Sequence, residues 1–266
     1  MTALGFGQTN IQASKTVVDM QVIPYKYAPS TGAAYVVVNA HVRGTSARLL
    51  VDTGSRYSFV DGSPVGHSES ESDILTFVGK KQTVRIGSFQ RDCVVNSAAW
   101  SKESRRMWDG LAGNELFAGQ RESDGTRLTF DFVKRKLMID WTKNRPKYVP
   151  RENSLTIPFK LSDQDHHILI RVRLGNASTQ TCIFDTGTAT GLLVSDKLYE
   201  KISHGSTYIF TRVALSIMGR QFHTDATALG VLPDAPPCIG VALFRHYRTV
   251  IDYRDRKIYL EPPSKH

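Results

Sequence analysis

The sequence has few cysteines, no long apolar run and no recognisable leader segment. Its three cysteines, Cys93, Cys182 and Cys238, lie far apart among 266 residues. This spacing excludes a dense disulfide framework and any CxxC metal or redox motif. No segment approaches the roughly 18 consecutive apolar residues of a membrane span, and the first ten residues lack the basic start and apolar stretch of a signal peptide. We therefore expect a soluble chain without a membrane span, whose export to a periplasmic or secreted location would require a leader outside this sequence.

Positive charge is in excess, but without the pattern of a nucleic-acid-binding surface. The formal net charge is +9, from 34 Lys and Arg against 25 Asp and Glu. The basic residues form short clusters, such as 134–136 and 254–257, which are typical of solvated hairpin turns. No basic stripe with interleaved aromatic residues accompanies them. We therefore expect no nucleic-acid partner.

One pattern is written twice along the chain. Each copy contains a short apolar segment around a proline, an alternating apolar run, an apolar-apolar-glycine segment and a final strand-turn-strand pattern. The matched ranges are 22–26 with 156–160, 35–44 with 167–175, 111–117 with 238–244, and 128–140 with 249–260. Short strands between turns dominate both copies. We predict an all-β chain, with short helical turns at most at Ser58–Asp61 and Ser195–Ile202.

A polar connector separates the two copies. The range 141–153 contains Asn144, Pro146, Pro150 and several charged residues, which favour a loop. We therefore predict two related domains, an N-terminal one over 1–148 and a C-terminal one over 149–266.

The most informative matched segments are Leu49–Ser55 and Cys182–Thr188. In each, three apolar residues lead into Asp-Thr-Gly and then a hydroxyl residue. A single Asp-Thr-Gly is weak evidence, because an aspartate in a structural turn often caps its own loop. Two copies in matching surroundings, each followed by an apolar-apolar-glycine segment, are far less expected by chance. The correlated set indicates a chemical role for Asp52 and Asp185.

This set resembles the pepsin and retropepsin clan of aspartic peptidases, from Val22 to Leu260. The resemblance implies an all-β, bilobal fold in which two retropepsin-like lobes enclose the active-site cleft, in a compact, bacterial-type monomer. It implies that Asp52 and Asp185 are the catalytic pair. It also implies loop-supporting residues, with the two threonines bracing the loops, and threading segments beside them. The supporting residues are Thr53, Gly54, Ser55, Thr186, Gly187 and Thr188, and the threading segments are 111–113 and 238–240.

The chemistry of such a site follows from two opposed carboxyl groups. Glycine allows the two backbones to approach closely. Like charges at short distance oppose double ionisation, so the pair shares one proton, as in pepsin. The ionised carboxylate can then take a proton from water while its partner polarises the scissile carbonyl of a peptide or protein substrate, without a cofactor or metal. By resemblance, the Ser55 and Thr188 hydroxyls donate hydrogen bonds to these carboxylates.

The resemblance also implies a β-hairpin flap over the site. The strand-like ranges 74–78 and 83–86 flank Gly79, where we expect the hairpin to turn. The flap candidates are Phe77, Val78, Gly79 and Lys80. Such a flap would limit the access of water during the reaction.

Other interpretations of the same residues remain open. A catalytically silent peptide-binding module on the same fold would keep the loops without the chemistry, and a glycosidase would also use two carboxylates. Asp131 and Asp252 are duplicated too, but they lack the glycine signature, so we interpret them as structural. The pair His166-His167 has no suitably spaced partner ligands and predicts no metal site.

Overall fold

The computed structural model describes residues 14–27, 31–61, 73–119, 124–175, 178–203, 210–228 and 235–263. Among these residues, 54% lie in strands and 11% in helices. The prediction of a mainly β chain is therefore confirmed. Within the same ranges, no helix has the length and apolar character that a membrane crossing requires.

The first half of the chain contains nine strands and two short helices among the described residues. They are β1 (Lys15–Pro24), β2 (Ala34–Val42), β3 (Thr45–Asp52), β4 (Ser58–Asp61), β5 (Ile74–Ile86), β6 (Phe89–Ala99), α1 (Lys102–Met107), β7 (Gly110–Gly113), α2 (Asn114–Ala118), β8 (Arg127–Asp131) and β9 (Lys136–Asp140).

The second half contains ten strands and two helices within the part that the structure describes. They are β10 (Leu155–Pro158), β11 (Lys160–Leu161), β12 (Ile168–Leu174), β13 (Thr179–Phe184), β14 (Leu192–Val194), α3 (Asp196–Ile202), β15 (Thr211–Ile217), β16 (Arg220–Ala228), β17 (Cys238–Ile239), α4 (Val241–Phe244), β18 (Arg248–Asp252) and β19 (Lys257–Glu261).

The same strand order occurs in both halves. In the first half, six neighbouring strands run β2-β3-β7-β4-β6-β5, and β2 also pairs with β5. In the second half the order is β12-β13-β17-β14-β16-β15, and β12 also pairs with β15. The strand that leads into each Asp-Thr-Gly, β3 or β13, pairs in parallel with the strand of the apolar-apolar-glycine segment, β7 or β17. This pairing fixes each motif at the end of a strand inside a sheet.

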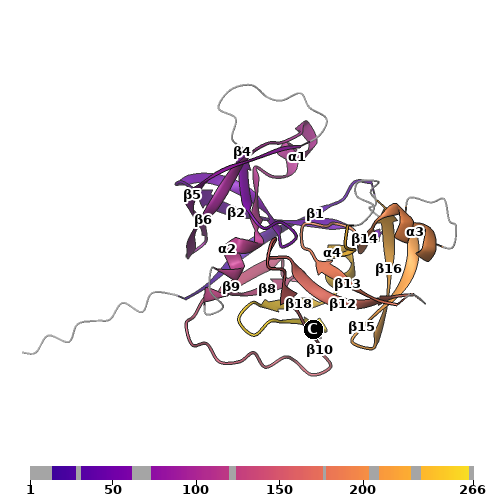
Figure 1. Ribbon diagram of the computed structural model, residues 1–266. Coiled ribbons are helices and arrows are strands. Elements are labelled where there is room, and N and C mark those ends of the chain that lie inside the picture. The colour runs from indigo at the N-terminus through magenta and orange to yellow at the C-terminus, as the bar shows by residue number, and fades with distance from the viewer. Residues whose placement is uncertain are drawn as a thin grey trace, which may run out of the picture.

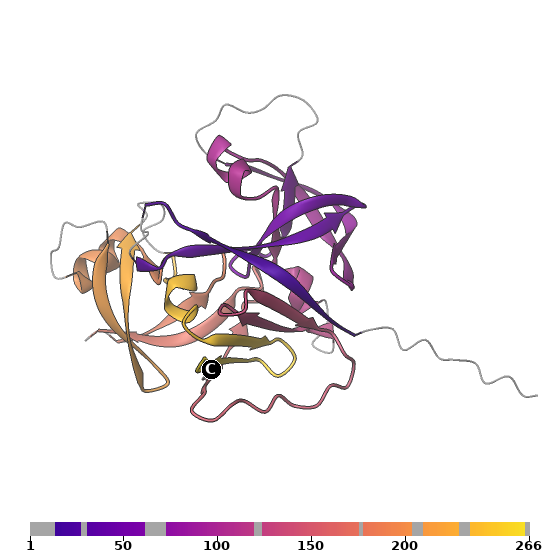
Figure 2. The same cartoon turned by 180° about the vertical axis from the view of Figure 1, so that it is seen from behind.

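Six antiparallel strands join the two halves. Their order is β10-β19-β18-β8-β9-β1, with three strands from each half. Figure 1 shows most of them beneath the strands β2–β7 of the first half, with β12–β16 of the second half to one side. The first part of β1 pairs with β9 and its last part pairs with β2, and Figure 2 shows this long strand crossing the back of the molecule. This joining sheet continues through β1 and β2 into the first motif-bearing group, so that both form one 12-stranded sheet, whereas the second motif-bearing group belongs to a separate 7-stranded sheet.

Apolar packing continues across the boundary between the halves. One large buried cluster includes residues from both. The Phe184 and Phe244 rings stack with centroids 4.5 Å apart, and Phe132 of the first half lies 6.1 Å from Phe244. Burial of aromatic rings of this size contributes strongly to stability. The end of the strand that leads to Asp185 therefore packs against aromatic side chains.

The two expected helical turns have different outcomes. Asp196–Ile202 is helix α3, within the predicted Ser195–Ile202. The prediction for Ser58–Asp61 is wrong, because this segment is strand β4, parallel to β6 and antiparallel to β7. Phe59 is buried there at 1% exposure, and sheet pairing on both sides of β4 outweighs the local tendency to turn.

Asp252, one of the two duplicated aspartates interpreted as structural, lies in a buried ion-pair network. It is fully buried, and it accepts hydrogen bonds from Arg127 and Arg145, both at 2.8 Å. Burial alone raises the pKa of Asp252, but the hydrogen bonds and charges of Arg145 and Arg127 outweigh burial and hold that pKa below its usual range. The network connects β8, the connector and β18, so it stabilises the junction of the halves.

We predict that Asp252→Asn lowers the free energy of unfolding by about 3–5 kcal/mol at pH 7, because it leaves the buried Arg145 guanidinium without its counter-charge and removes the nearer of the two acids beside Arg127. Since the pKa of Asp252 is lowered in the folded state, the stabilisation is present above the unfolded pKa of about 3.9 and is lost as the pH falls through the folded value. Urea unfolding at pH 7 and at about pH 3 measures both effects. Asp19→Asn is the control, because that side chain is 83% exposed, and an equal loss in both variants would contradict the prediction.

Candidate active site

The two Asp-Thr-Gly motifs meet at the boundary of the halves and are locked by their threonines. The Thr53 N–H donates to Thr186 Oγ1 at 3.1 Å, and the Thr186 N–H donates to Thr53 Oγ1 at 3.0 Å. Each threonine hydroxyl in turn donates to a carbonyl of the opposite strand, Thr53 to Phe184 at 3.0 Å and Thr186 to Val51 at 2.7 Å. Both threonines are fully buried. These four hydrogen bonds fix the two loops relative to each other, in the bracing position that the resemblance implies.

Glycine is required in both motifs because each one faces the aspartate of the other. A Cβ atom on Gly54 would lie 2.4 Å from Asp185 Cγ, and one on Gly187 would lie 2.4 Å from Asp52 Cγ. Real side chains do not approach so closely, so any other residue would push the opposite carboxyl group away. The reciprocal contact brings Asp52 and Asp185 together from positions 133 residues apart.

Backbone N–H groups hold the two carboxyl groups in place. Gly54 donates to Asp52 Oδ1 at 3.0 Å and to Asp185 Oδ1 at 2.9 Å. Asp52 Oδ1 also accepts from the Ser55 N–H, and Asp185 Oδ1 accepts from the Gly187 N–H at 2.7 Å. One N–H shared between two carboxyl oxygens means that the oxygens lie very close to each other.

This proximity changes the protonation of Asp52. Withdrawal from water raises its pKa most, and the negative charge of Asp185 and a hydrogen bond between the two carboxyl groups raise it further. Hydrogen bonds from the Gly54 and Ser55 N–H groups act in the opposite direction, but the pKa of Asp52 stays well above its usual range. The pair therefore favours a state in which Asp52 keeps a proton.

The hydroxyl residues after the two motifs are not equivalent. Thr188 Oγ1 donates to Asp185 Oδ2 at 2.6 Å, as the resemblance implies. The matching expectation for Ser55 is wrong, because its hydroxyl donates to the Tyr57 carbonyl at 3.0 Å. That acceptor lies on the following segment of the same loop and takes the Ser55 hydroxyl away from Asp52. Negative charge on Asp185 is thus stabilised by one more donor than negative charge on Asp52.

Short helices hold the far side of each loop. The Asn114 N–H at the start of α2 donates to the Ser55 carbonyl at 2.6 Å, and the Val241 N–H at the start of α4 donates to the Thr188 carbonyl at 2.8 Å. The expected threading segments 111–113 and 238–240 lead directly into these helices. Sequence reasoning missed Tyr253, whose hydroxyl donates to Asn114 Oδ1 from the opposite half. The only signal available in the sequence was a large aromatic residue directly after Asp252.

The expected turn of the flap hairpin is in a different place. Gly79 lies inside β5, which continues from Ile74 to Ile86, so the prediction of a turn at Gly79 is wrong. The chain reverses at Gly87 and Ser88, between β5 and β6. Gly79 lies at an irregularity in the pairing of these strands, and a Cβ atom there would come within 2.5 Å of the Asn96 and Val94 side chains. A glycine inside a strand here marks close packing, rather than the hairpin tip. The four flap candidates Phe77, Val78, Gly79 and Lys80 therefore all lie in a strand.

Histidines and cysteines are the other chemical candidates within the described ranges. Those ranges contain no cluster of three or more His, Cys, Asp or Glu residues suited to a metal ion. The three cysteines are unpaired, with Cys93 and Cys182 buried, and burial raises the pKa of the Cys93 thiol to about 11. The buried thiols are therefore protonated at neutral pH and poor nucleophiles.

A comparison with models of known protein families finds no match, and a search of curated protein sequences finds no significant match either.

The threonine bracing gives a prediction that does not depend on any activity. Thr53→Val keeps the shape of the side chain but leaves the Thr186 N–H and the Phe184 carbonyl without their partner. Each unsatisfied buried group costs about 1–3 kcal/mol, so we expect a loss of about 2–5 kcal/mol in the free energy of unfolding. Thr53→Ser retains the hydroxyl and should cost about 1 kcal/mol, the transfer free energy of one methyl group. Denaturant unfolding measures both variants, and equal losses would show that the hydroxyl does not brace the loops.

Proposed function

We propose that this protein is an aspartic endopeptidase of the pepsin and retropepsin type, with Asp52 and Asp185 as its catalytic pair in a cleft between two lobes. The observation that carries the proposal is the reciprocal meeting of two identical loops, each with its glycine against the carboxyl group of the other. Two strand groups of equal order, one within a 12-stranded sheet and one within a separate 7-stranded sheet, support a bilobal arrangement. One chain supplies both aspartates, so the proposed enzyme acts as a monomer.

The hydrogen bonds support different tasks for the two aspartates. Asp185 accepts from Gly54, Gly187 and Thr188, and these donors stabilise its ionised form. Asp52 has a raised pKa and carries the shared proton. Asp185 then takes a proton from the attacking water as the water oxygen bonds to the scissile carbon, and Asp52 transfers its proton to the carbonyl oxygen. The product of this step is a tetrahedral gem-diol. As its C–N bond breaks, Asp185 passes its proton to the leaving nitrogen and one diol hydroxyl returns a proton to Asp52, which gives an amine and a carboxylic acid without a covalent enzyme intermediate.

The spacing of the carboxyl groups disfavours a glycosidase. Retaining glycosidases hold their two carboxyl groups about 5–5.5 Å apart and inverting enzymes about 6.5–9.5 Å. Here the two carboxyl groups are hydrogen-bonded to each other and share the Gly54 N–H. No sugar ring fits between groups in direct contact. A catalytically silent peptide-binding module stays an alternative, although both aspartates and both glycines of the motifs are intact, which favours the enzyme.

Digestion of a peptide library across a range of pH, read by mass spectrometry, tests the proposal directly. An endopeptidase produces new internal termini in library peptides and leaves a parallel panel of oligosaccharides intact. Sugar cleavage would support the glycosidase instead. Retention of library peptides on immobilised protein without cleavage at any pH would support the silent module.

We predict that Asp52→Asn and Asp185→Asn each reduce kcat/KM for a library-derived peptide by at least about 10²–10⁴-fold, the usual contribution of one general acid or base. The folded state should persist, because asparagine can still accept the N–H hydrogen bonds. Asp131→Asn is the matched control, since this duplicated aspartate receives a hydrogen bond from the Lys134 N–H of its own hairpin turn. Near-normal activity of either catalytic-pair variant would refute the assignment.

The unequal hydroxyls predict an unequal effect on the pH profile. Thr188→Ala removes a donor to Asp185, so the catalytic carboxylate becomes easier to protonate and the inactive doubly protonated state forms at higher pH. A hydrogen bond to a charged group of about 1.5 kcal/mol corresponds to an upward shift of the acidic limb of kcat/KM by about one pH unit. Thr188→Ser should return the acidic limb of kcat/KM to its wild-type position, and Ser55→Ala should leave that position unchanged. A shift with Ser55→Ala equal to that with Thr188→Ala would contradict the observed hydrogen bonds.

A further inference from the structure

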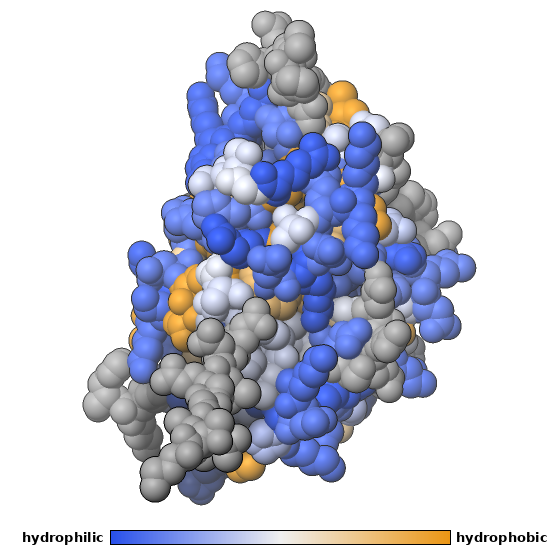
Figure 3. Space-filling model, turned by 90° about the vertical axis from the view of Figure 1, so that its left-hand side faces the viewer, coloured by the Kyte–Doolittle hydropathy of each residue, from blue (hydrophilic) through white to orange (hydrophobic). Residues whose placement is uncertain are grey.

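A polar pocket lies on β5, away from both aspartates. It has a volume of about 540 Å³ and is lined by Arg43, Lys80, Lys81, Gln82, Thr83 and Asp92. The turn between β2 and β3 reaches it, because the Arg43 N–H donates to the Thr83 carbonyl at 3.3 Å. Figure 3 shows that the face of the molecule on the side of β5 and β6 is mainly hydrophilic. The pocket is therefore open to a polar ligand.

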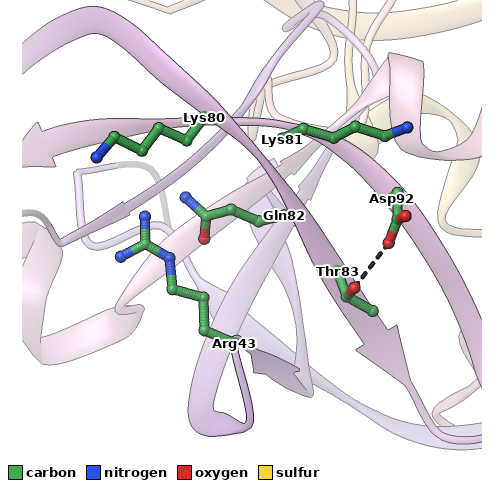
Figure 4. A pocket seen from close by; sticks show the side chains of 6 residues that line it. All are labelled: Arg43, Lys80, Lys81, Gln82, Thr83 and Asp92. Atoms are coloured by element: carbon green, nitrogen blue, oxygen red, sulfur yellow. Dashed lines mark hydrogen bonds between the residues drawn. The ribbon is translucent and has the colours of Figure 1, made fainter.

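Three positively charged side chains line this pocket, and its other lining residues do not neutralise them. Arg43, Lys80 and Lys81 are exposed, and the described residues provide none of them with an ion-pair partner. The single acid of the pocket, Asp92, already accepts a hydrogen bond from Thr83 at 2.6 Å. Figure 4 shows the Arg43, Lys80 and Gln82 side chains on one side of β5, with Lys81 directed to the other side. The resulting field favours a negatively charged ligand.

Gln82 gives independent evidence that a ligand belongs here. Its side chain is 9% exposed and lines the pocket, yet its Oε1 atom has no hydrogen-bond partner. A buried amide oxygen without a partner costs about 1–3 kcal/mol, so native proteins rarely leave one. A donor from a ligand, such as a peptide N–H, would satisfy it. A ligand with both an N–H group and a carboxylate matches Gln82 together with the Arg43 and Lys80 cations.

The size and place of the pocket agree with a peptide segment. Its volume lies in the range of sites for ligands much larger than a single ion. In the order β3-β7-β4-β6-β5, four strand spacings separate Asp52 on β3 from Lys80 on β5. At about 4.8 Å per spacing the path along the sheet is about 19 Å, and because the β2–β5 pairing closes this strand group, an extended peptide covers the shorter straight distance with at most about six residues.

We infer that this pocket is an exosite for an acidic segment of a protein or peptide. The Arg43 guanidinium and the Lys80 ammonium bind the carboxylates, and Gln82 pairs with the backbone of the segment. The inference rests on the proposed function when it assigns acidic-flanked peptides as the substrate class. In such a substrate, the acidic residues lie within about six positions of the scissile bond.

Binding without cleavage tests the pocket independently of peptidase activity. Fluorescence anisotropy of labelled hexaglutamate is measured with the wild type and with the double variant Arg43→Asn, Lys80→Gln. The matched control is Arg135→Asn, Lys134→Gln, since Arg43 and Arg135 both lie in hairpin turns at positive φ, 55° and 50°, which asparagine tolerates. Both double variants lose the same net charge. We expect at least tenfold weaker binding for the pocket variant and less than a twofold change for the control.

Equal weakening in both double variants would show nonspecific attraction to a basic protein and would overturn the exosite. Binding of labelled hexaglutamine to the wild type as tightly as hexaglutamate would overturn it as well. Gln82→Met retains the volume and the cations but removes the amide, so at least threefold weaker binding is expected. Unchanged binding in Gln82→Met would overturn the role of the amide, and thermal unfolding checks that each variant remains folded.

Kinetics then connect the pocket to cleavage. Two substrates share one cleavable core and carry either four glutamates or four glutamines about six residues from the scissile bond. We expect a lower KM for the glutamate substrate with unchanged kcat, and loss of this advantage in the pocket variant alone. Hexaglutamate binding without any peptide cleavage would leave the exosite standing and refute the peptidase. Cleavage with no preference for glutamate, together with no hexaglutamate binding, would refute the exosite and leave the peptidase.

Discussion

The close opposition of two carboxyl groups is the constraint on which the site depends. Two like charges in contact repel each other, so the structure must offset this repulsion. Three features of the site do so. The threonines Thr53 and Thr186 lock the loops through four buried hydrogen bonds. Glycine in each motif leaves room for the opposite carboxyl group. The raised pKa of Asp52 opposes a second negative charge in the pair. The joining sheet and the buried Asp252 network keep the two halves in the position that makes this contact possible.

The duplicated chain meets this constraint with a small asymmetry. Both halves follow one strand order, and both motifs contact the start of a short helix. They differ at the hydroxyl after each glycine, because Thr188 donates to Asp185 whereas Ser55 donates to the backbone. A symmetrical pair would share its proton without preference. The extra donor favours ionised Asp185 and protonated Asp52. The direction of the hydroxyl after each motif therefore distinguishes the proposed base from the proposed acid.

Much of the fold and of the candidate site could be predicted from the sequence, because the signals are local and repeated. Alternating apolar residues predict strands, and the matched motifs select Asp52 and Asp185 among the 25 acidic residues. Other features depend on tertiary neighbours. Pairing with β6 carries β5 straight through Gly79, pairing on both sides makes Ser58–Asp61 a strand, and the Tyr57 carbonyl redirects the Ser55 hydroxyl. The convergence of Arg43 with Lys80 and Gln82 likewise depends on a turn that meets a distant strand, which no linear pattern records.

The central claim is that the opposed carboxyl groups share one proton and that Asp52 holds it. The most direct test is a carboxyl NMR titration of protein labelled at aspartate, with the Asp52 signal identified by its loss in Asp52→Asn. The account predicts that the Asp52 carboxyl group stays protonated to a pH well above the ordinary aspartate value of about 3.9. Titration of the Asp52 carboxyl group near its ordinary value would contradict the account.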